Sequence, residues 1–231
     1  MIAENIAAIR EEIAKAAIAA NRDPKEIRLC AATKMNDADR VREAIAAGID
    51  CCGENRVQEL TAKLAQNAYE GAELHFIGHL QTNKVKQVVG KVSLIQSVDS
   101  FRLLEAIDKE AKKQAITQDI LLEVNVAGEE SKSGFNAEEI PEILENIKTF
   151  ENIRILGFMA IPPICQNFAD NHKFFQKMYN LSVDITRKKY DNVCVKILSM
   201  GMSGDYQDAI ACGSNMIRLG TAIFGARDYT K

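Results

Sequence analysis

Lys34 is placed where a lysine can do covalent chemistry. It directly follows the apolar residues 27–33, which are predicted to form a buried strand, so its ammonium group lies where a strand ends and a loop begins. A lysine with a buried stem and a head group in a cleft can lose its proton near neutral pH and attack an aldehyde. Because a lysine at a strand end is more commonly solvated or ion-paired, a Schiff-base role for Lys34 needs a second feature.

That second feature is a pair of segments near the C-terminus in which small and hydroxyl residues accompany apolar runs. Ser203 and Gly204 follow one run, and Gly220 and Thr221 lie in the next. Such residues are ordinary turn formers, but backbone N–H groups aimed out of turns of this kind also bind phosphate. An aldehyde-capturing lysine together with a phosphate cradle predicts pyridoxal 5'-phosphate (PLP) as the ligand.

Strand and helix patterns alternate along the chain, which indicates how these residues are brought together. Residues 2–20 space their isoleucines at helical intervals and are predicted to form an amphipathic helix. Largely apolar strands separated by helices then indicate a parallel sheet covered by helices. The predicted strands are 27–33, 49–52, 73–77, 92–98, 119–126, 153–158, 193–199 and 217–224, and the predicted helices between them are 37–47, 54–67, 81–90, 100–114, 136–148, 168–189 and 204–212.

Eight such units favour a single (β/α)8 barrel, also called a TIM barrel, as one domain over residues 1–231. Few residues follow the last predicted strand, so the N-terminal helix is expected to cover the face of the barrel that a final helix would otherwise cover. Reactive groups in this fold collect at the C-terminal ends of the strands, and phosphate sites commonly follow the last two. The polar and small residues expected at that end include Lys34, Asn55, His79, Asp99, Asn125, Met159, Ser203, Gly204, Arg218, Gly220 and Thr221.

Composition excludes several classes of partner. The formal net charge is −3 over 231 residues, with both signs interspersed, whereas a nucleic-acid partner usually requires a concentrated basic face. No apolar stretch approaches the roughly 20 residues that span a bilayer, and the first residues lack the basic-then-apolar order of a signal peptide. We therefore expect a cytoplasmic monomer with no nucleic-acid or membrane partner.

The cysteines and two histidines do not predict a metal site. The six cysteines lie mostly inside apolar runs, without the paired CxxC spacing of zinc or redox sites, and are expected to be reduced core residues. His75 and His79 are four residues apart on a strand that runs into a glycine turn, where they need not share a face. His75 is expected to be a hydrogen-bonded structural residue. The cysteines are Cys30, Cys51, Cys52, Cys165, Cys194 and Cys212.

Eight stretches of the sequence carry a resemblance to a known family. They are Ala31-Ala-Thr-Lys34, Gly53-Glu-Asn-Arg-Val-Gln-Glu59, His75-Phe-Ile-Gly-His-Leu-Gln-Thr-Asn-Lys84, Val98-Asp-Ser100, Lys132-Ser-Gly134, Gly157-Phe-Met-Ala-Ile161, Leu198-Ser-Met-Gly-Met-Ser-Gly-Asp205 and Arg218-Leu-Gly-Thr-Ala-Ile-Phe-Gly225. In these stretches the chain resembles the YggS/PROSC family of pyridoxal phosphate homeostasis proteins. The resemblance implies the barrel of the alanine racemase N-terminal domain, fold type III among PLP proteins.

The resemblance also implies roles for individual residues. Lys34 matches the lysine that holds PLP as a Schiff base, and Arg218 matches the arginine that faces the pyridine nitrogen. The phosphate cradle matches Ser203, Gly204, Gly220 and Thr221.

Three more residues have two possible roles each. Asn55 either caps the following helix or lies beside the cofactor ring, and Met159 is either a core residue or part of the pocket lining. Lys132 lies in a polar loop that is bracketed by glycines, which is typical of a surface loop, although a contact with cofactor or partner is the alternative.

The sequence favours a PLP carrier over an enzyme. A racemase of the related family needs a tyrosine from a separate C-terminal domain, and this chain is expected to end directly after its barrel. A carrier would bind PLP reversibly in vitamin B6 homeostasis and supply it to PLP-dependent apo-enzymes. The alternatives are a PLP-dependent amino-acid racemase and an aldolase-type barrel that uses Lys34 as its Schiff base. The visible absorption of the purified protein distinguishes the PLP-binding alternatives from the aldolase, because an aldolase carries no bound chromophore.

Overall fold

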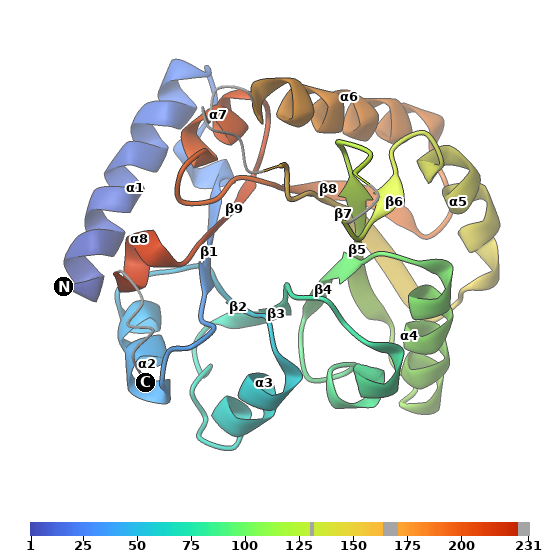
Figure 1. The fold of residues 1–231 in the computed structure, drawn as a ribbon, viewed down its shortest axis with the longest axis horizontal. Helices are drawn as coiled ribbons and strands as arrows, with labels where there is room; N and C mark the ends of the chain where they lie inside the picture. The colour runs from blue at the N-terminus through green and yellow to red at the C-terminus, as the bar shows by residue number, and fades with distance from the viewer. Residues whose placement is uncertain (130–131, 164–170, 226–231) are drawn as a thin grey trace.

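Short apolar strands alternate with helices and close on one another into a barrel (Figure 1). The computed structural model describes residues 1–129, 132–163 and 171–225. Eight parallel strands neighbour one another in the order β4-β3-β2-β1-β9-β8-β7-β5, and pairing of β4 with β5 closes the ring. The eight are β1 (Arg28–Ala32), β2 (Cys51–Glu54), β3 (Glu73–Phe76), β4 (Leu94–Val98), β5 (Gln118–Asn125), β7 (Ile153–Met159), β8 (Val193–Ser199) and β9 (Met216–Leu219).

Helices surround this barrel, as its predicted fold requires (Figure 1). The α-helices are α1 (Ile2–Ala19), α2 (Ala38–Ala46), α3 (Val57–Leu64), α4 (Phe101–Lys113), α5 (Ile140–Asn146), α6 (His172–Lys188), α7 (Tyr206–Ala211) and α8 (Thr221–Phe224). Three short 3-10 helices join them: η1 (Pro24–Glu26), η2 (Thr82–Gln87) and η3 (Ile147–Thr149). Among the described residues, no helix has both the length and the apolar character to cross a membrane.

The N-terminal helix takes the position that the sequence predicted for it. Its buried residues Ile2, Ile6, Ile9, Ile13 and Ala17 recur every three or four positions and form one apolar face. In Figure 1 this helix lies outside β1 and β9, and it contacts α7, α8 and α2. The expectation that α1 covers this side of the barrel is confirmed.

Several predicted boundaries are wrong. The predicted strand 217–224 stops at Leu219, because residues 221–224 turn into the short helix α8. The predicted helix 136–148 begins only at Ile140, where Pro141 occupies the first turn, a position that tolerates its missing N–H. The two residues of β6 (Phe135–Asn136) precede it and pair with β5 outside the ring.

Smaller differences affect three other elements. Strand β2 lies two residues later than predicted, and the predicted helix 81–90 is the 3-10 helix η2. Helix α6 begins at His172, and residues 168–170 of the predicted helix lie outside the described residues.

Glycine at position 157 lets β7 and β8 pack together where their register shifts. Gly157 has φ +142°, and a Cβ there would lie 1.9 Å from the carbonyl oxygen of Ile197 on β8. The pairing shifts between Ile155 and Gly157. A side chain at this position would therefore force the two strands apart.

Side-chain alternation divides the buried residues into two environments. One large cluster packs the outward faces of the strands against the helices. Inward-facing residues form two small clusters inside the barrel: Cys30, Cys51, Ile77 and Met216 in one, and Leu94, Leu121 and Met159 in the other. The strand period of two residues produces this division.

A buried ion pair joins β2 to α3 on the outward side. Lys63 Nζ lies 2.7 Å from Glu54 Oε2, and both side chains are buried, with exposed fractions of 6% and 0%. The same ammonium group donates to the carbonyl oxygen of Thr33 at 2.7 Å, and the hydroxyl of Tyr69 donates to Glu54 at 3.2 Å. This network fixes the end of β1, directly before Lys34.

The first prediction concerns this pair. Lys63→Met leaves the Glu54 carboxylate buried without its cation, so we expect the free energy of unfolding to fall by about 3–5 kcal/mol. Urea denaturation measures the loss. The matched control is Lys113→Met, which removes an exposed pair with Glu110 and is expected to cost at most about 1 kcal/mol. Equal losses in the two variants would contradict this role for Lys63.

Candidate functional site

Lys34 opens onto a pocket at the C-terminal end of the barrel strands. The cavity has a volume of about 270 Å³, close to the lower limit of about 300 Å³ for small-molecule sites. Of the predicted site residues, the structure brings six together around it. The walls are Ala32, Lys34, Met202, Ser203, Gly204, Asp205, Arg218, Gly220 and Thr221.

Hydrogen bonds hold the main chain on both sides of Lys34. Before it, the Thr33 hydroxyl donates to Glu54 Oε2 at 3.1 Å and lies 3.2 Å from the carbonyl oxygen of Gly53. After it, the backbone N–H of Met35 donates to Glu59 Oε2 at 2.7 Å. Met35 has φ +61°, a conformation that non-glycine residues rarely adopt. The root of the lysine is thus fixed by contacts with the neighbouring strand and helix.

A tight turn after β8 forms one side of the pocket. The N–H of Asp205 donates to the carbonyl oxygen of Met202 at 3.1 Å, which closes a four-residue turn. The closing hydrogen bond of such a turn uses neither the amide of Ser203 nor that of Gly204, its central residues. Asp205 Oδ1 accepts from the N–H of Met202 at 2.7 Å, and its Oδ2 accepts from Asn171 at 2.8 Å. Both oxygens of this carboxylate are therefore used to shape the turn.

The start of α8 forms the other side. The carbonyl oxygen of Gly220 accepts from the N–H groups of Ile223 and Phe224 at 3.0 and 2.9 Å. The first amides of a helix, here those of Thr221 and Ala222, have no partner within it. A Cβ at Gly220 would lie 3.5 Å from the Cβ of Ala32, another wall residue, and would take space from the pocket.

Arg218 points from β9 into the barrel and is almost fully buried. Its Nη1 donates to Ser199 Oγ at 2.6 Å, and its Nη2 donates to the carbonyl oxygen of Ala160 at 2.9 Å. Burial lowers the pKa of Arg218, while the charges of Cys30, Glu123 and Asp205 act in the opposite direction. Arginine remains a cation under all relevant conditions, so the pocket floor carries a fixed positive charge.

Hydrogen bonds continue from Arg218 across the barrel interior. Ser199 Oγ donates to Gln96 Oε1 at 2.7 Å, and Gln96 Nε2 lies 2.9 Å from His75 Nδ1. His75 Nε2 lies 3.2 Å from Glu73 Oε2 at the opposite end of the barrel. The expectation that His75 is a hydrogen-bonded structural residue is met. This chain of contacts satisfies the buried polar groups between the two ends.

Burial and hydrogen bonding shift the pKa values of several of these interior groups. A hydrogen bond with Cys51 is the main cause that lowers the pKa of the Cys30 thiol to about 5. Contacts with His75 also lower this pKa, whereas burial raises it. Its hydrogen bond with His75, together with Arg28, lowers the pKa of Glu73 to about 2.

Glu123 is a residue near the site that the sequence analysis missed. Burial raises the pKa of Glu123 to about 7, and the negative charge of Asp99 acts in the same direction. The charges of Arg218 and His79 oppose this increase. Its strand neighbour in β7 is Met159. The available signal was a single carboxylate inside the apolar run 120–124, on the same face of the strand as Leu121.

Other predicted site residues lie outside the pocket wall. Asn55 follows β2, and its Oδ1 is buried without a hydrogen-bond partner in the described structure. Met159 is buried inside the barrel with Leu94 and Leu121, as a core residue would be. His79 is exposed and lies 3.0 Å from Asp99 Oδ2, and Lys132 pairs with Glu129 at 2.7 Å.

The cysteines mostly follow the prediction of reduced core residues. Cys30, Cys51, Cys52 and Cys212 are buried and free, whereas Cys194 is free but exposed, so the prediction is wrong for Cys194. Cys194 lies in the first half of β8, where side chains alternate between partly buried and exposed. Cys165 lies outside the described residues.

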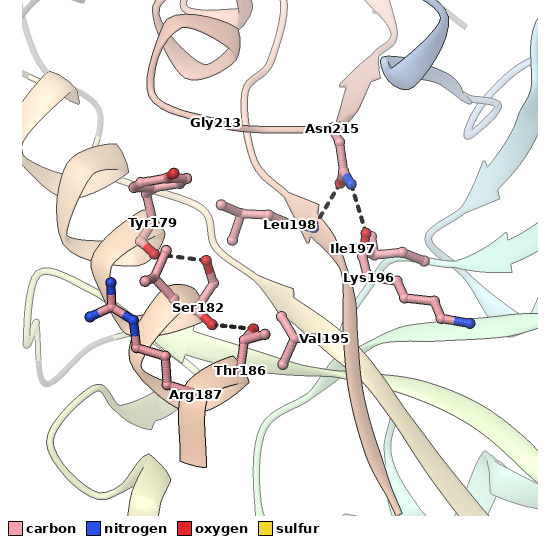
Figure 2. Close-up of a pocket in the computed structure, with 11 residues that line it drawn as sticks. Tyr179, Ser182, Thr186, Arg187, Val195, Lys196, Ile197, Leu198, Gly213 and Asn215 are labelled. Atoms are coloured by element: carbon pink, nitrogen blue, oxygen red, sulfur yellow. Dashed lines mark hydrogen bonds between the residues drawn. The ribbon is translucent and has the colours of Figure 1, made fainter. Parts of the chain in front are cut away.

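A second cavity, of about 350 Å³, lies between α6 and β8 (Figure 2). There Asn215 replaces strand pairing: its Nδ2 donates to the carbonyl oxygen of Lys196 at 2.7 Å, and its Oδ1 accepts from the N–H of Leu198 at 2.8 Å. The hydroxyls of Ser182 and Thr186 donate to carbonyls of their own helix. Asn215, Ser182 and Thr186 are thus hydrogen-bonded to the protein's own backbone, and Lys34 lies in the other pocket.

Comparison with known proteins gives a consistent assignment. The family model for the N-terminal domain of alanine racemase matches residues 4–228. A protein of Aquifex aeolicus named pyridoxal phosphate homeostasis protein is 41% identical over 226 residues, which cover 98% of each chain. The corresponding protein of Escherichia coli is 36% identical, over all of this chain and 98% of its own.

A solved structure of similar fold carries the ligand. PipY of Synechococcus elongatus, with PLP bound, is 30% identical, with a TM-score of 0.84 over 97% of this chain and all of its own. Family model, relatives and fold thus agree along nearly the whole sequence. The chain belongs to the family of pyridoxal phosphate homeostasis proteins, which are built on the alanine racemase N-terminal barrel.

Proposed function

We propose that this protein binds PLP reversibly through a Schiff base with Lys34 and takes part in intracellular PLP homeostasis. The observation that carries the proposal is the convergence of Lys34, a turn with Ser203 and Gly204, the Gly220-Thr221 helix start and a buried arginine on one pocket. The relatives' shared name and the PLP bound to PipY support it.

The residues present fit each part of PLP. The aldehyde of PLP condenses with a lysine amine with loss of water, and Lys34 has its root fixed at the pocket wall. The amides and hydroxyls of Ser203 and Thr221, with the amide of Gly204, would bind the phosphate. Arg218 would face the pyridine nitrogen, and the unsatisfied Oδ1 of Asn55 offers a further polar contact.

The same residues support a carrier rather than an enzyme. Arg218 cannot hand its proton to the pyridine nitrogen, so the ring remains a modest electron sink. Among the described wall residues, the groups that could exchange protons are Lys34 and Asp205, and both Asp205 oxygens already accept hydrogen bonds. One base on one side of the ligand favours binding without turnover.

We further propose that the protein acts as a cytoplasmic monomer that exchanges PLP with PLP-dependent apo-enzymes. The buried free thiols support a reducing compartment. An acceptor apo-enzyme would draw PLP from Lys34 because transfer of a Schiff base between two amines is reversible.

The second prediction tests the attachment site. Borohydride reduction of the PLP-loaded protein, followed by peptide mass mapping, is expected to place the adduct on Lys34. Lys34→Arg keeps the positive charge but cannot form the Schiff base, so both visible absorption and adduct should be lost. The control Lys196→Ala, at the second cavity, should retain both. Recovery of the adduct on another lysine, with Lys34 unmodified, would refute the assignment.

The third prediction concerns catalysis. The PLP-loaded protein is expected to turn over amino acids far more slowly than the rates on the order of 1–1000 per second typical of enzymes, because the described pocket offers one proton-exchanging base. Incubation with a panel of L- and D-amino acids, followed by chiral chromatography and keto-acid detection, measures this. If any amino acid of the panel is rapidly racemised or transaminated, and Lys34→Arg abolishes this activity, the enzyme interpretation is correct.

A further inference from the structure

Three soft donor groups meet inside the barrel, where Cys30 on β1 pairs in register with Arg218 on β9. They are the thiols of Cys30 and Cys51 and the imidazole of His75, and their ligand atoms all lie within 4.8 Å of one another. All three side chains are buried. We propose that Cys30, Cys51 and His75 bind a thiophilic metal ion, Zn²⁺ or Cu⁺, at a site separate from the Lys34 pocket.

Strand pairing explains why these residues converge although they are far apart in sequence. Cys30 on β1 pairs directly with Cys51 on β2. Cys51 in turn pairs with Glu73 on β3, and His75 lies two residues further along the same face of that strand. Three neighbouring parallel strands thus present one donor each to the same part of the interior.

The donor set matches the chemistry of soft closed-shell cations. Thiolate and imidazole are the usual ligands of Zn²⁺ and Cu⁺, and the thioether of Met216 belongs to the same interior cluster as both cysteines. In a tetrahedral zinc site with Zn–S bonds of about 2.3 Å, ligand atoms lie about 3.7 Å apart. The observed limit of 4.8 Å is close enough for small side-chain rotations to complete the site.

A carboxylate already orients the histidine. Glu73 Oε2 lies 3.2 Å from His75 Nε2 and accepts from Arg28 Nη2 at 2.8 Å. Histidines that bind metals commonly donate their other ring N–H to a carboxylate, which fixes the tautomer. The second ring nitrogen, Nδ1, lies 2.9 Å from Gln96 Nε2. If a cation binds His75 Nδ1, the Gln96 amide loses this contact but keeps its hydrogen bond to the Met216 sulfur at 3.1 Å.

Charge and access also suit a cation. Two thiolates and a divalent ion sum to zero. Two thiolates and a monovalent ion keep one negative charge, which the neighbouring Arg28 and Arg218 offset. Glu73 is 53% exposed while it contacts the buried His75, so the cluster lies one contact from solvent at the N-terminal end of the barrel. This end is opposite the Lys34 pocket, which leaves the proposed PLP site free.

The fourth prediction tests this site in the full-length protein. The reduced, chelator-treated protein is titrated with Zn²⁺ against a chromophoric chelator, and with Co²⁺ as a spectroscopic substitute. We expect one equivalent to bind, with thiolate-to-Co²⁺ charge-transfer absorption. Cys30→Ala and Cys51→Ala should each weaken Zn²⁺ binding by about tenfold or more and remove the absorption, and Glu73→Gln should weaken binding by about tenfold.

Two cysteine variants serve as matched controls. Cys52→Ala removes a buried thiol that packs on the helix side of β2, next to Cys51 in sequence. This variant should leave Zn²⁺ binding unchanged. Cys212→Ala tests a second cluster, formed with His172 and Asp208, and should also leave it unchanged. The proposal would be overturned if the absorption persists in Cys30→Ala and Cys51→Ala but is lost in Cys212→Ala.

Two further measurements keep the outcome decisive if a variant fails to fold. Anomalous scattering from a zinc-soaked crystal should give a peak within bonding distance of Cys30, Cys51 and His75, and its absence there would refute the site. Thiol titration of the unfolded, unreduced protein separates metal binding from a disulfide. If the unreduced protein shows two thiols fewer than its cysteine count, and the reduced protein binds no metal, a Cys30–Cys51 disulfide is the correct interpretation and the metal site is refuted.

Discussion

The alternation of side chains along eight closed parallel strands decides which buried polar side chains of the strands face the helices and which face the barrel interior. An outward-facing residue meets a helix, and an inward-facing residue meets side chains from neighbouring strands. Glu54 faces outward from β2 and is neutralised by Lys63 of α3. Arg218 faces inward from β9 and donates to groups of β8 and the end of β7. Each buried charge is stable because its partners are fixed by the same alternation.

Both compensated charges lie beside Lys34. Strand β1, which ends just before the lysine, is flanked by β2 with Glu54 and by β9 with Arg218. The amine of Lys34 is therefore rooted on regular elements, whereas the proposed phosphate contacts come from a turn and a short helix after β8 and β9. A rigid attachment point and a separate anion cradle are what reversible, oriented binding of PLP requires.

Most of the barrel could be predicted from the sequence because buried parallel strands are nearly continuous apolar runs. Strand β8 was placed with its exact bounds, but the run 217–224 does not distinguish a strand from the short helix α8. Of the candidate site residues, those that directly follow strands could be placed by topology alone. Lys34, which follows the predicted strand 27–33, is an example.

Pairwise contacts between distant strands could not be predicted in this way. The role of Glu54 depends on Lys63 lying opposite it, and its position in the Gly53-Glu-Asn-Arg56 stretch suggests only a helix cap. The cluster of Cys30, Cys51 and His75 depends on strand register, which leaves no spacing motif in the sequence. Single-sequence patterns report local periodicity, so convergence across three strands becomes visible only in the folded chain.

The most direct test of the central claim is a crystal structure of the PLP-loaded protein. The account predicts electron density that is continuous from Lys34 Nζ to the ligand, with Arg218 at the pyridine nitrogen. The phosphate should lie against the backbone amides of Ser203, Gly204 and Thr221. Density joined to a different lysine, or a phosphate bound away from these amides, would contradict the account.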